Sequence, residues 1–339
     1  MKTGYYERLK KEGVSADRLN SNYSNLLASA QGVGPKDDLR LNSNESIFFA
    51  RELEYRKAQI IDVIYQVLKA AKSMPVSMEA PDWVEYITWT QYDKVGQAKI
   101  ITNASQDLPR VDVKGAQMSG QVRTLGSAYG YNLQEIKASN ALGKSLDSRR
   151  SMTSNEANAR LMDNLAWFGD PNNNLQGFIN APNITQVTIP NGAAGHTQWA
   201  TKTADEIVSD LIAISSAIPV STKGIETPNR MIMPIDQYLL ASQIRLPNTA
   251  ISALDYFLDV NPFIEEVDWI NELAGAGAEG SDRLMCYRKD PLKFTMEIPL
   301  LYQQLEPEKR GLEYVVDGIS RFGGVLIYKP MSIAYADGI

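Results

Sequence analysis

Residues 145–180 read SLDSRRSMTSNEANARLMDNLAWFGDPNNNLQGFIN, and this stretch decides how the rest of the chain is arranged. Its mainly apolar positions recur at steps of three and four, which is typical of one face of an amphipathic helix. These positions are Leu146, Thr153, Ala157, Leu161, Leu165 and Phe168, with Arg150 in the one gap. Ser145 can cap the helix start. Gly169 and Pro171 predict its end, because glycine tolerates a left-handed conformation and proline cannot continue a helix.

The start of this helix has an alternative. Thr153 and Glu156 have the spacing of a capping box, so the helix could instead begin at Thr153 after a separate turn. The Ser, Thr and Asn residues in the middle are weak helix formers. We favour one long helix over residues 145–168. After it, residues 172–177 predict a turn, and Phe178 begins an apolar return.

The bulk composition describes an ordinary soluble protein. The chain has 339 residues, of which 44% are hydrophobic and 22% are charged. This length allows two or three domain-sized units with a sizeable core. No run of eighteen apolar residues predicts a membrane span, and the first residues lack the apolar region of a secretory signal. We therefore expect no membrane partner.

Charge and rare residues narrow the possible chemistry. The net charge is −6, and no concentrated basic face of the kind that binds duplex DNA is visible. The chain has one histidine, His196, and one cysteine, Cys286, so these residues cannot form a zinc cluster. A nucleophilic centre of the Ser-His-Asp or Cys-His type would have to use His196. That residue lies in a Gly-rich stretch, and we interpret it as a loop histidine without a role.

The N-terminal part divides into an arm and a helix. Residues 1–45 are polar and carry too few apolar side chains to fold alone, so they are disordered or become ordered on a neighbour. Residues 47–71 return to a helical period, with Asn44 as a plausible cap and Met74-Pro75 as the end. We assign residues 46–80 to this N-terminal helix.

Strand patterns follow. Residues 83–92 are rich in aromatic and β-branched residues, as is the segment AKIIT further on. After the polar stretch 103–120, residues 121–139 again read as extended, with Gly126 and Gly130 as kinks or bulges.

The simplest account of these strands is one long two-stranded hairpin over residues 84–140, with its tip near residues 107–109. Such a ribbon is marginally stable alone, so we expect it to lie on its own domain or on a neighbouring subunit. Its basic residues (Lys94, Lys99, Arg110, Lys114 and Arg123) alternate with acidic ones (Asp93, Asp107 and Asp112). That mixture favours charge pairing with a protein over phosphate tracking. Trp83 and Trp89 are packing residues or interface anchors.

The rest of the chain predicts a mixed α/β unit and a late β layer, so the fold class is α+β. The predicted elements are a strand and a loop within 186–195, strands at 229–233, 263–270 and 284–288, and helices at 204–218, 234–241 and 251–258. Pro219 ends the first of these helices. Later strands are predicted at 292–301, 312–316 and 325–327, with a turn at Phe322-Gly323-Gly324. This layer pairs with the hairpin's base or flanks the central helix.

Two motifs could carry chemistry, and we assign a site to neither. Residues 275–280 match GxGxxG, but dinucleotide binding needs a helix after the motif, and here a strand pattern follows. The acidic residues of the same region are Glu265, Glu266, Asp268, Glu272, Glu279 and Asp282. They lack calcium-loop spacing, and we interpret them as a solvated edge. No catalytic, cofactor-binding or metal-ligating residue is assigned, which argues against an enzyme.

The order of these parts resembles the major capsid proteins of tailed bacteriophages, with the Hong Kong 97-type fold that encapsulin shells share. The local resemblance lies in FGDPNNNLQGFIN (168–180) and in the closing SRFGGVLIYKPMSIAYADGI (320–339). The resemblance implies an N-terminal arm (1–45), a hairpin called the E-loop (about 86–131), a spine helix (145–168), an axial domain (203–290), and a peripheral domain (141–202 and 291–339).

The resemblance also implies a function. Copies would assemble as pentamers and hexamers into an icosahedral shell that encloses double-stranded phage DNA without binding it specifically. Portal and scaffolding proteins would be separate partners, and assembly would take place in the bacterial cytoplasm before the chain becomes part of the virion. The Lys–Asn crosslink of some members has no match here. An encapsulin-like compartment that loads cargo enzymes, and an α/β enzyme that uses carboxylates, remain alternatives.

Overall fold

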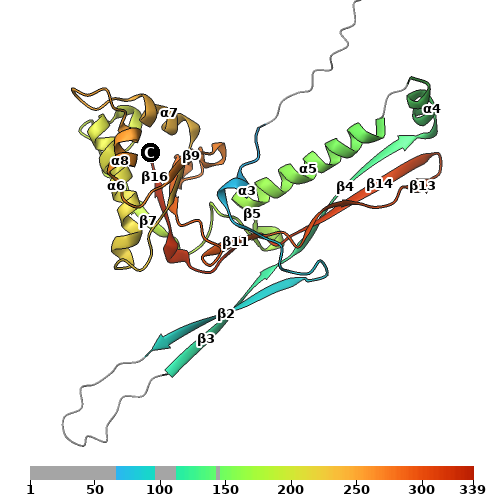
Figure 1. Ribbon diagram of the computed structural model, residues 1–339, viewed down its shortest axis with the longest axis horizontal. Helices are drawn as coiled ribbons and strands as arrows, with labels where there is room; N and C mark the ends of the chain where they lie inside the picture. Colours follow the sequence, from blue (N-terminus) through green and yellow to red (C-terminus); the bar gives the residue numbers. More distant parts are fainter. Residues whose placement is uncertain (1–65, 96–111, 143–145) are drawn as a thin grey trace, which may run out of the picture. The chain divides into compact units, whose positions relative to one another are not determined.

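The computed structural model describes residues 66–95, 112–142 and 146–339 (Figure 1). All of the described residues belong to one compact unit, residues 66–339. The predicted arm, most of the predicted N-terminal helix, the hairpin tip and Ser145 lie outside the described residues.

The long helix is one element, α5, which spans Leu146–Phe168 and confirms the prediction of a single helix. Thr153 does not start it, because its hydroxyl donates to the carbonyl of Arg149 one turn earlier (2.9 Å). Gly169 ends the helix at φ +68°, and an added Cβ there would lie 2.5 Å from the Leu175 carbonyl oxygen. The chain then turns through the short strands β5 (Gly169–Asp170) and β6 (Leu175–Gln176).

Helix α5 lies along a sheet of four strands, which we call the peripheral sheet. Its members are β4 (Arg123–Asn132), β12 (Leu300–Gln304), β13 (Glu308–Arg310) and β14 (Glu313–Phe322). Strand β14 pairs with β12, β13 and β4, so the late β layer does pair with the returning arm of the hairpin region. The predicted bulges at Gly126 and Gly130 are wrong, because the β4–β14 register is continuous across both residues.

Hydrogen bonds between side chains cross the contact between α5 and this sheet. The Ser154 hydroxyl lies 2.7 Å from that of Ser127 and 2.6 Å from that of Tyr302, and Ser320 donates to Asn158 (2.8 Å). These bonds fix which face of each strand lies against the helix.

Two strand predictions fail near this sheet. Residues 133–142 form helix α4 (Leu133–Leu142) and not an extended segment, because the Asn132 side chain accepts from Gln134 N and Glu135 accepts from Asn132 N. The predicted strand at 292–301 is two strands in different sheets. β11 (Phe294–Glu297) pairs with β1 (Val76–Ser77) and β15 (Val325–Ile327), whereas β12 pairs with β14.

The second large sheet, the axial sheet, has the order β7-β16-β10-β8-β9. Its strands are β7 (Thr185–Thr188), β16 (Ile333–Asp337), β10 (Arg283–Tyr287), β8 (Arg230–Met233) and β9 (Glu266–Trp269). Strand β16 was not among the predicted strands, and both 141–202 and 291–339 were expected in the peripheral domain. β7 and β16 belong instead to the sheet of residues 203–290, since β16 pairs with β10 over five residues.

Three helices accompany the axial sheet: α6 (Ala204–Ser221), α7 (Ile235–Gln243) and α8 (Ala253–Val260). Helix α6 runs past Pro219, where the sequence predicted its end. A proline in the last turn removes only one helical hydrogen bond, and the turn is held by Thr222 N, which donates to the Ile218 carbonyl (3.0 Å). A capping box of Thr203 and Glu206 starts the helix.

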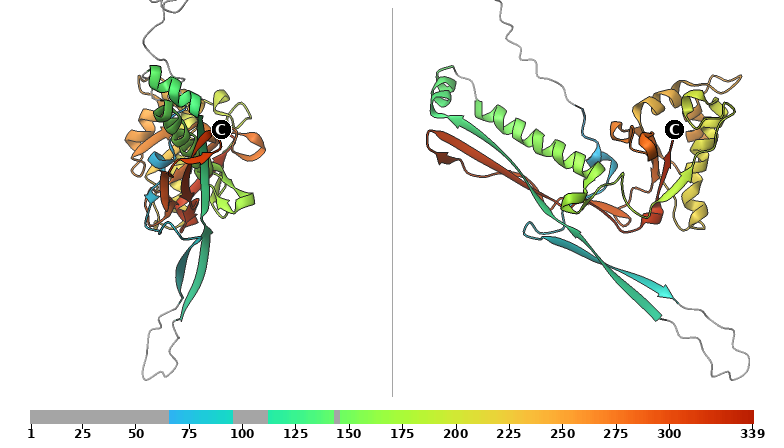
Figure 2. Two further views of the ribbon diagram at one scale, coloured as in Figure 1. Left: turned by 90° about the vertical axis from the view of Figure 1, so that its right-hand side faces the viewer. Right: turned by 180° about the vertical axis from the view of Figure 1, so that it is seen from behind.

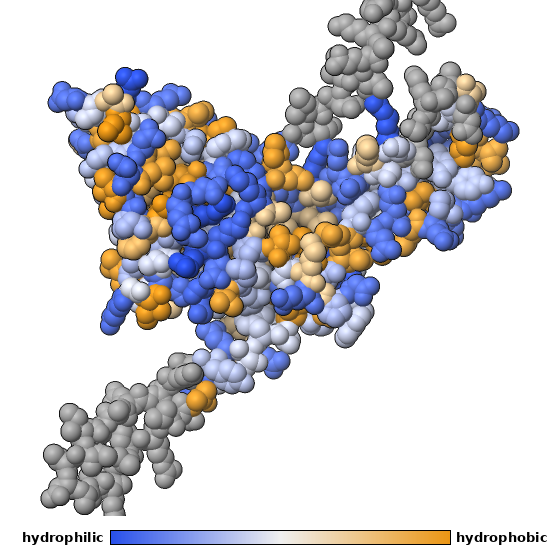
Figure 3. Space-filling view, in the orientation of Figure 1, coloured by the Kyte–Doolittle hydropathy of each residue, from blue (hydrophilic) through white to orange (hydrophobic). Residues whose placement is uncertain are grey.

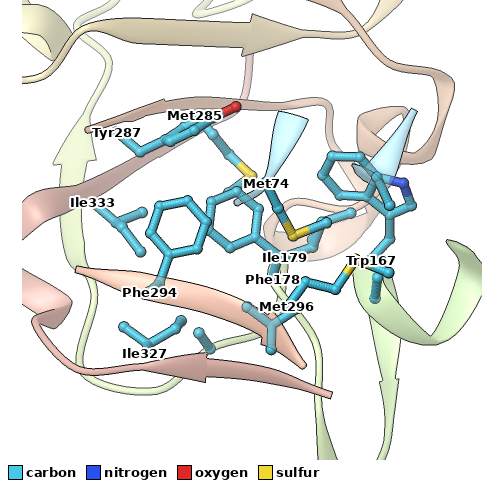
Figure 4. Packing of buried hydrophobic residues seen from close by; sticks show 14 of the residues in the cluster. Met74, Trp167, Phe178, Ile179, Met285, Tyr287, Phe294, Met296, Ile327 and Ile333 are labelled. Atoms are coloured by element: carbon cyan, nitrogen blue, oxygen red, sulfur yellow. The ribbon is translucent and has the colours of Figure 1, made fainter. Parts of the chain in front are cut away.

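One aromatic cluster joins the end of α5 to the axial sheet (Figure 4). Phe178 is fully buried; its ring stacks on Phe294 at 4.8 Å and meets the edge of Tyr287 at 5.1 Å. Trp167 packs on the same ring at 6.2 Å. The apolar return that follows the spine helix in the sequence is therefore the centre of this core.

The described part of the predicted N-terminal helix is mostly not helical. Residues 66–69 have no regular structure, and helix α3 covers only Ala70–Ser73 before Pro75. The Asp163 carboxylate of α5 accepts from Ala70 N (2.8 Å), which holds this segment on the long helix.

Candidate assembly interface

Strands β2 (Tyr86–Val95) and β3 (Asp112–Gln121) form an antiparallel ribbon with ten register pairs. The first strand of the predicted hairpin is confirmed by β2, but the predicted return strand at 121–139 is wrong, because β2 pairs with residues 112–121. Residues 83–85 precede the first strand. The return strand begins at Asp112, inside the polar stretch 103–120, where the sequence pattern predicted no strand. Cross-strand hydrogen bonds can hold a polar strand of this kind, which propensity alone does not indicate. The ribbon is about 34 Å long at the usual rise per residue.

Most side chains of this ribbon are exposed on both of its faces. The exposed fractions of Tyr86, Tyr92, Val113 and Met118 are 56%, 68%, 53% and 46%. A two-stranded ribbon without a covered face is marginally stable in water. These apolar side chains therefore provide a surface that a further protein segment would bury favourably.

The contacts of the ribbon with the rest of the described chain lie at its base. The Trp89 ring meets the edge of Tyr328 at 5.3 Å. Gly120 lies so close to Leu326 that an added Cβ would approach its Cδ2 to 2.3 Å, so a larger residue here would force the Leu326 side chain to shift. The adjacent Val122 is buried, and its amide donates to the Glu85 carbonyl (2.8 Å).

Strand β3 continues almost directly into β4, with only Val122 between them. Both strands lie end to end in Figures 1 and 2, so one extended segment passes from the ribbon into the peripheral sheet. The sequence pattern predicts a single return arm here. The structure shows that it changes partner, from β2 to β14, at Val122.

The face of the peripheral sheet that points away from α5 is the second candidate surface. Gly126 is exposed there, and an added Cβ would meet only the Gly318 carbonyl, at 3.7 Å. Its backbone does not have the positive φ that favours glycine. Neither packing nor conformation of the described chain therefore requires glycine at this position. A glycine inside a strand often marks a place where another backbone approaches closely.

Helices α6 and α8 present a third, apolar surface (Figure 3). The exposed fractions of Ile212, Val220 and Val260 are 41%, 74% and 55%. Beyond its first turn, α6 carries a single charged residue, Asp210, and that residue is buried. Helix α8 has two exposed aspartates, Asp255 and Asp259, so the uncharged part of this surface lies on α6. An exposed helix face without charge is unusual for a surface that remains in water.

The residues that sequence chemistry singled out do not form a reactive centre. His196 is exposed in a loop, where its carbonyl accepts from Gly192 N (2.9 Å). Cys286 is fully buried in β10, and burial raises the pKa of its thiol. The GxGxxG segment is a loop with one short 3-10 turn (Ala278–Gly280), as predicted, and strand β10 follows it.

The prediction of a solvated acidic edge is wrong for Asp268 and Glu266, because cations from distant segments pair with both carboxylates. The Asp268 carboxylate lies 3.2 Å from Lys69 Nζ and 2.6 Å from Lys72 Nζ, and Glu266 pairs with Arg230. Burial opposes ionisation of Asp268, but hydrogen bonds from Lys72, Trp269 N and Lys69 outweigh it and lower the pKa of this carboxyl. The sequence could not show these pairs, since the lysines precede Asp268 by almost 200 residues.

A polar pocket of about 820 Å³ lies at one end of the axial sheet. Two of its carboxylates already have partners: Asp282 accepts from Gln237 Nε2 (3.0 Å), and Asp337 pairs with Arg283 (2.6 Å). Among the described residues, no three His, Cys, Asp or Glu side chains are grouped so that they could hold a metal ion. No helix in the described part of the chain is long and apolar enough to cross a membrane.

Comparison with known proteins identifies relatives. The family model described as major capsid protein matches residues 96–339. The structure is similar to the capsid of the myovirus phage XM1, with a TM-score of 0.74, 17% identity, and coverage of 87% of this chain and 99% of that chain. It is also similar to the capsid of a native GTA particle, with a TM-score of 0.60, 12% identity, and coverage of 88% of this chain and 99% of that chain. The similarity to a protein of Mycobacterium phage Ogopogo has a TM-score of 0.57, 10% identity, and coverage of 86% of this chain and 99% of that chain. No curated protein sequence matches.

Proposed function

The chain belongs to the major capsid protein family, the structural proteins that form capsid shells, and we propose that its copies assemble as pentamers and hexamers into an icosahedral shell around double-stranded DNA. The observation that carries this proposal is the ribbon of β2 and β3, which is anchored at its base and exposed on both faces. A subunit that functions alone has no use for such a ribbon. A shell subunit uses it to reach its neighbours.

The three candidate surfaces lie on different elements: the ribbon, the outer face of the peripheral sheet, and the α6–α8 face. Surfaces that differ from one another favour heterologous contacts, which continue from copy to copy until curvature closes them. Stable protein contacts bury roughly 1,200–2,000 Å² each. Several such contacts per copy make a strong shell even where each one is modest.

The charge of the chain supports an enclosing role and not a DNA-binding one. The net charge of −6 would weaken contact with DNA phosphates, so a genome could be packed and released without adhering to the wall. Scaffolding and portal proteins would act as separate partners. The assembled chain would reside in the virion after assembly in the cytoplasm of a bacterial host.

The test replaces the hairpin tip. In one variant, residues 96–111 give way to a two-residue Asn-Gly turn that joins Val95 to Asp112, which are register partners. In the matched control, residues 96–111 keep their length and composition but are permuted. We expect both variants to fold and neither to form shells, as judged by sedimentation velocity and negative-stain images. Normal shells from both would contradict the proposal. Shells of the unchanged chain that hold protein cargo and no nuclease-protected DNA would favour the compartment alternative.

A further inference from the structure

Strand β4 has one open edge. Among the described strands, only β14 pairs with it. The Leu133 amide donates to the Leu312 carbonyl (3.2 Å), and along an antiparallel pair the residues that bond across alternate with residues whose backbone groups point away. The backbone N–H and C=O groups of Thr124, Gly126 and Ala128 are therefore directed away from β14, and all three residues are exposed. We call residues 124–128 the β4 edge.

The β4 edge is short, because backbone groups at both of its ends already have partners. At one end the Val122 amide donates to the Glu85 carbonyl (2.8 Å), just before β2 begins. At the other end Arg150 of α5 donates to the Gly130 carbonyl and also pairs with Glu135 (3.0 Å). A long strand that belongs to another sheet would meet these two contacts. The β4 edge therefore has room for about five residues of one extended segment.

Helix α5 provides an apolar surface beside this edge. Spacings of seven and eleven residues place Ala157 and Leu161 on the same face of α5 as Arg150, which bonds to β4 on its open side. Ala157 is exposed, and the exposed fraction of Leu161 is 43%. An extended segment on the β4 edge could therefore form main-chain hydrogen bonds with the strand and bury apolar side chains against the helix.

The segment that fits this edge comes from outside the described strands, because each of those strands already lies in a sheet of its own copy. Residues 96–111 join two register partners of the ribbon and must return on themselves. Residues 14–31 are the longest stretch of the N-terminal arm without glycine or proline, both of which are unfavourable inside strands. Leu19, Tyr23 and Leu27 recur there at steps of four, which places them on one side of an extended segment.

The start of the described chain contacts a different face of α5. The Ala70 amide donates to the Asp163 carboxylate (2.8 Å). At about 100° per residue, Asp163 lies roughly 160° around the helix from Leu161. The residues before Ala70 therefore reach α5 away from the β4 edge. A second copy, which the proposed shell brings into contact, can instead approach this edge from outside the subunit.

We propose that an extended segment from residues 14–31 of a second copy pairs with the β4 edge and turns its apolar side toward Ala157 and Leu161. This inference rests on the proposed shell function. Strand addition takes its affinity from main-chain hydrogen bonds, so a largely polar arm can supply the segment. The pairing also covers a strand edge that would otherwise be open to uncontrolled association.

The experiment uses Ala128→Cys labelled with benzophenone maleimide. The chain's one cysteine, Cys286, is fully buried, so the label reacts at the introduced thiol. On irradiation the excited ketone takes a hydrogen atom from a nearby C–H bond, and the two carbon radicals combine. Particles are assembled from labelled copies mixed with unlabelled copies that contain heavy nitrogen. We expect mass spectrometry to find position 128 joined to a heavy peptide from residues 14–31.

Lys309→Cys is the matched control, since Lys309 is exposed on β13, which pairs with the other side of β14. We expect no crosslink from position 309 to residues 14–31. If position 128 crosslinks to residues 14–31 only in their light form, the segment belongs to the same copy and the inference is wrong. Particles in which position 128 crosslinks elsewhere, or not at all, overturn this inference alone. If the unchanged chain forms no particles, the proposed function fails as well.

A second variant, Gly126→Pro, separates pairing from folding. Proline removes an N–H group that points to the open edge, and edge strands tolerate proline. We expect the melting temperature of the unassembled subunit to change by less than about 2 °C. The dissociated fraction of particles at fixed NaCl concentration should rise about fivefold, the effect of one lost hydrogen bond. An unchanged dissociated fraction would contradict pairing at this edge.

Leu125→Pro is the control for Gly126→Pro, because the Leu125 N–H is directed to Ser320 of β14. We expect this variant to lower the melting temperature of the unassembled subunit. If Gly126→Pro lowers it equally, the Gly126 N–H faces β14, and the open edge on which the inference depends does not exist.

Discussion

Two neighbouring glycines of the peripheral sheet predict opposite responses to the same substitution. Gly318 points toward α5, where an added Cβ would lie 2.2 Å from the Tyr302 hydroxyl. Gly126, on the adjacent strand, points away from the helix, and its added Cβ would meet only the Gly318 carbonyl at 3.7 Å. The first glycine is required by the fold of one copy, and the second is not.

The magnitudes follow from this geometry. Gly126→Ala should stabilise the unassembled chain by about 0.5–1 kcal/mol, because glycine inside a strand has excess conformational entropy in the unfolded state. Gly318→Ala should destabilise it by about 1–3 kcal/mol through overpacking. Loss of the Tyr302–Ser154 hydrogen bond (2.6 Å) would add about 1 kcal/mol.

The assay is urea unfolding of unassembled subunits, followed by particle formation under identical conditions. We expect Gly126→Leu, which fills the same outer space with a larger side chain, to keep a stable subunit and lose particles. If Gly126→Ala destabilises the subunit, the glycine serves the subunit's own fold. The argument that its outer face receives another backbone would then be refuted.

Two further predictions concern the subunit itself. Phe178→Ala should lower the free energy of unfolding by about 3–5 kcal/mol, since it removes a fully buried ring and its contact with Phe294. Calorimetry of the unassembled chain measures this loss. A loss below about 1 kcal/mol would contradict the central position of this ring. Asp268→Asn should destabilise the subunit most at neutral pH. The pKa of the Asp268 carboxyl is lowered in the folded state, so its ionised form adds stability at pH values above the unfolded pKa of about 3.9. That contribution is lost as the pH falls through the pKa of the folded state. Urea unfolding at neutral pH and near pH 3 tests this sign, and a variant effect that grows in acid would show it to be wrong.

The sequence predicted best where a local pattern and the packing agree. The period of residues 145–168 predicted helix α5, and Gly169 predicted its end, because the same residues form the helix and bury its face. Strand β8 was predicted for the same reason. The loop at 275–280 was predicted because a strand pattern, and not a helix, follows its glycines.

The failures occur where partners are distant in sequence. Strand β16 lies in the axial sheet only because β10 and β7 flank it, and nothing within residues 333–337 indicates that position. The change of partner at Val122 and the pairing of Asp268 with Lys69 and Lys72 depend equally on tertiary contacts. Of the candidate interface, the sequence predicted the ribbon but not the outer glycine, which is visible only once β4 and β14 are paired.

The central claim is that copies of this chain build a shell, and sedimentation velocity of the purified full chain tests it most directly, with negative-stain images of the fast fraction. We predict closed shells, or particles with the size of pentamers and hexamers. A chain that stays a monomer or dimer at all concentrations, including after co-expression with the proteins encoded beside its gene, would contradict the claim.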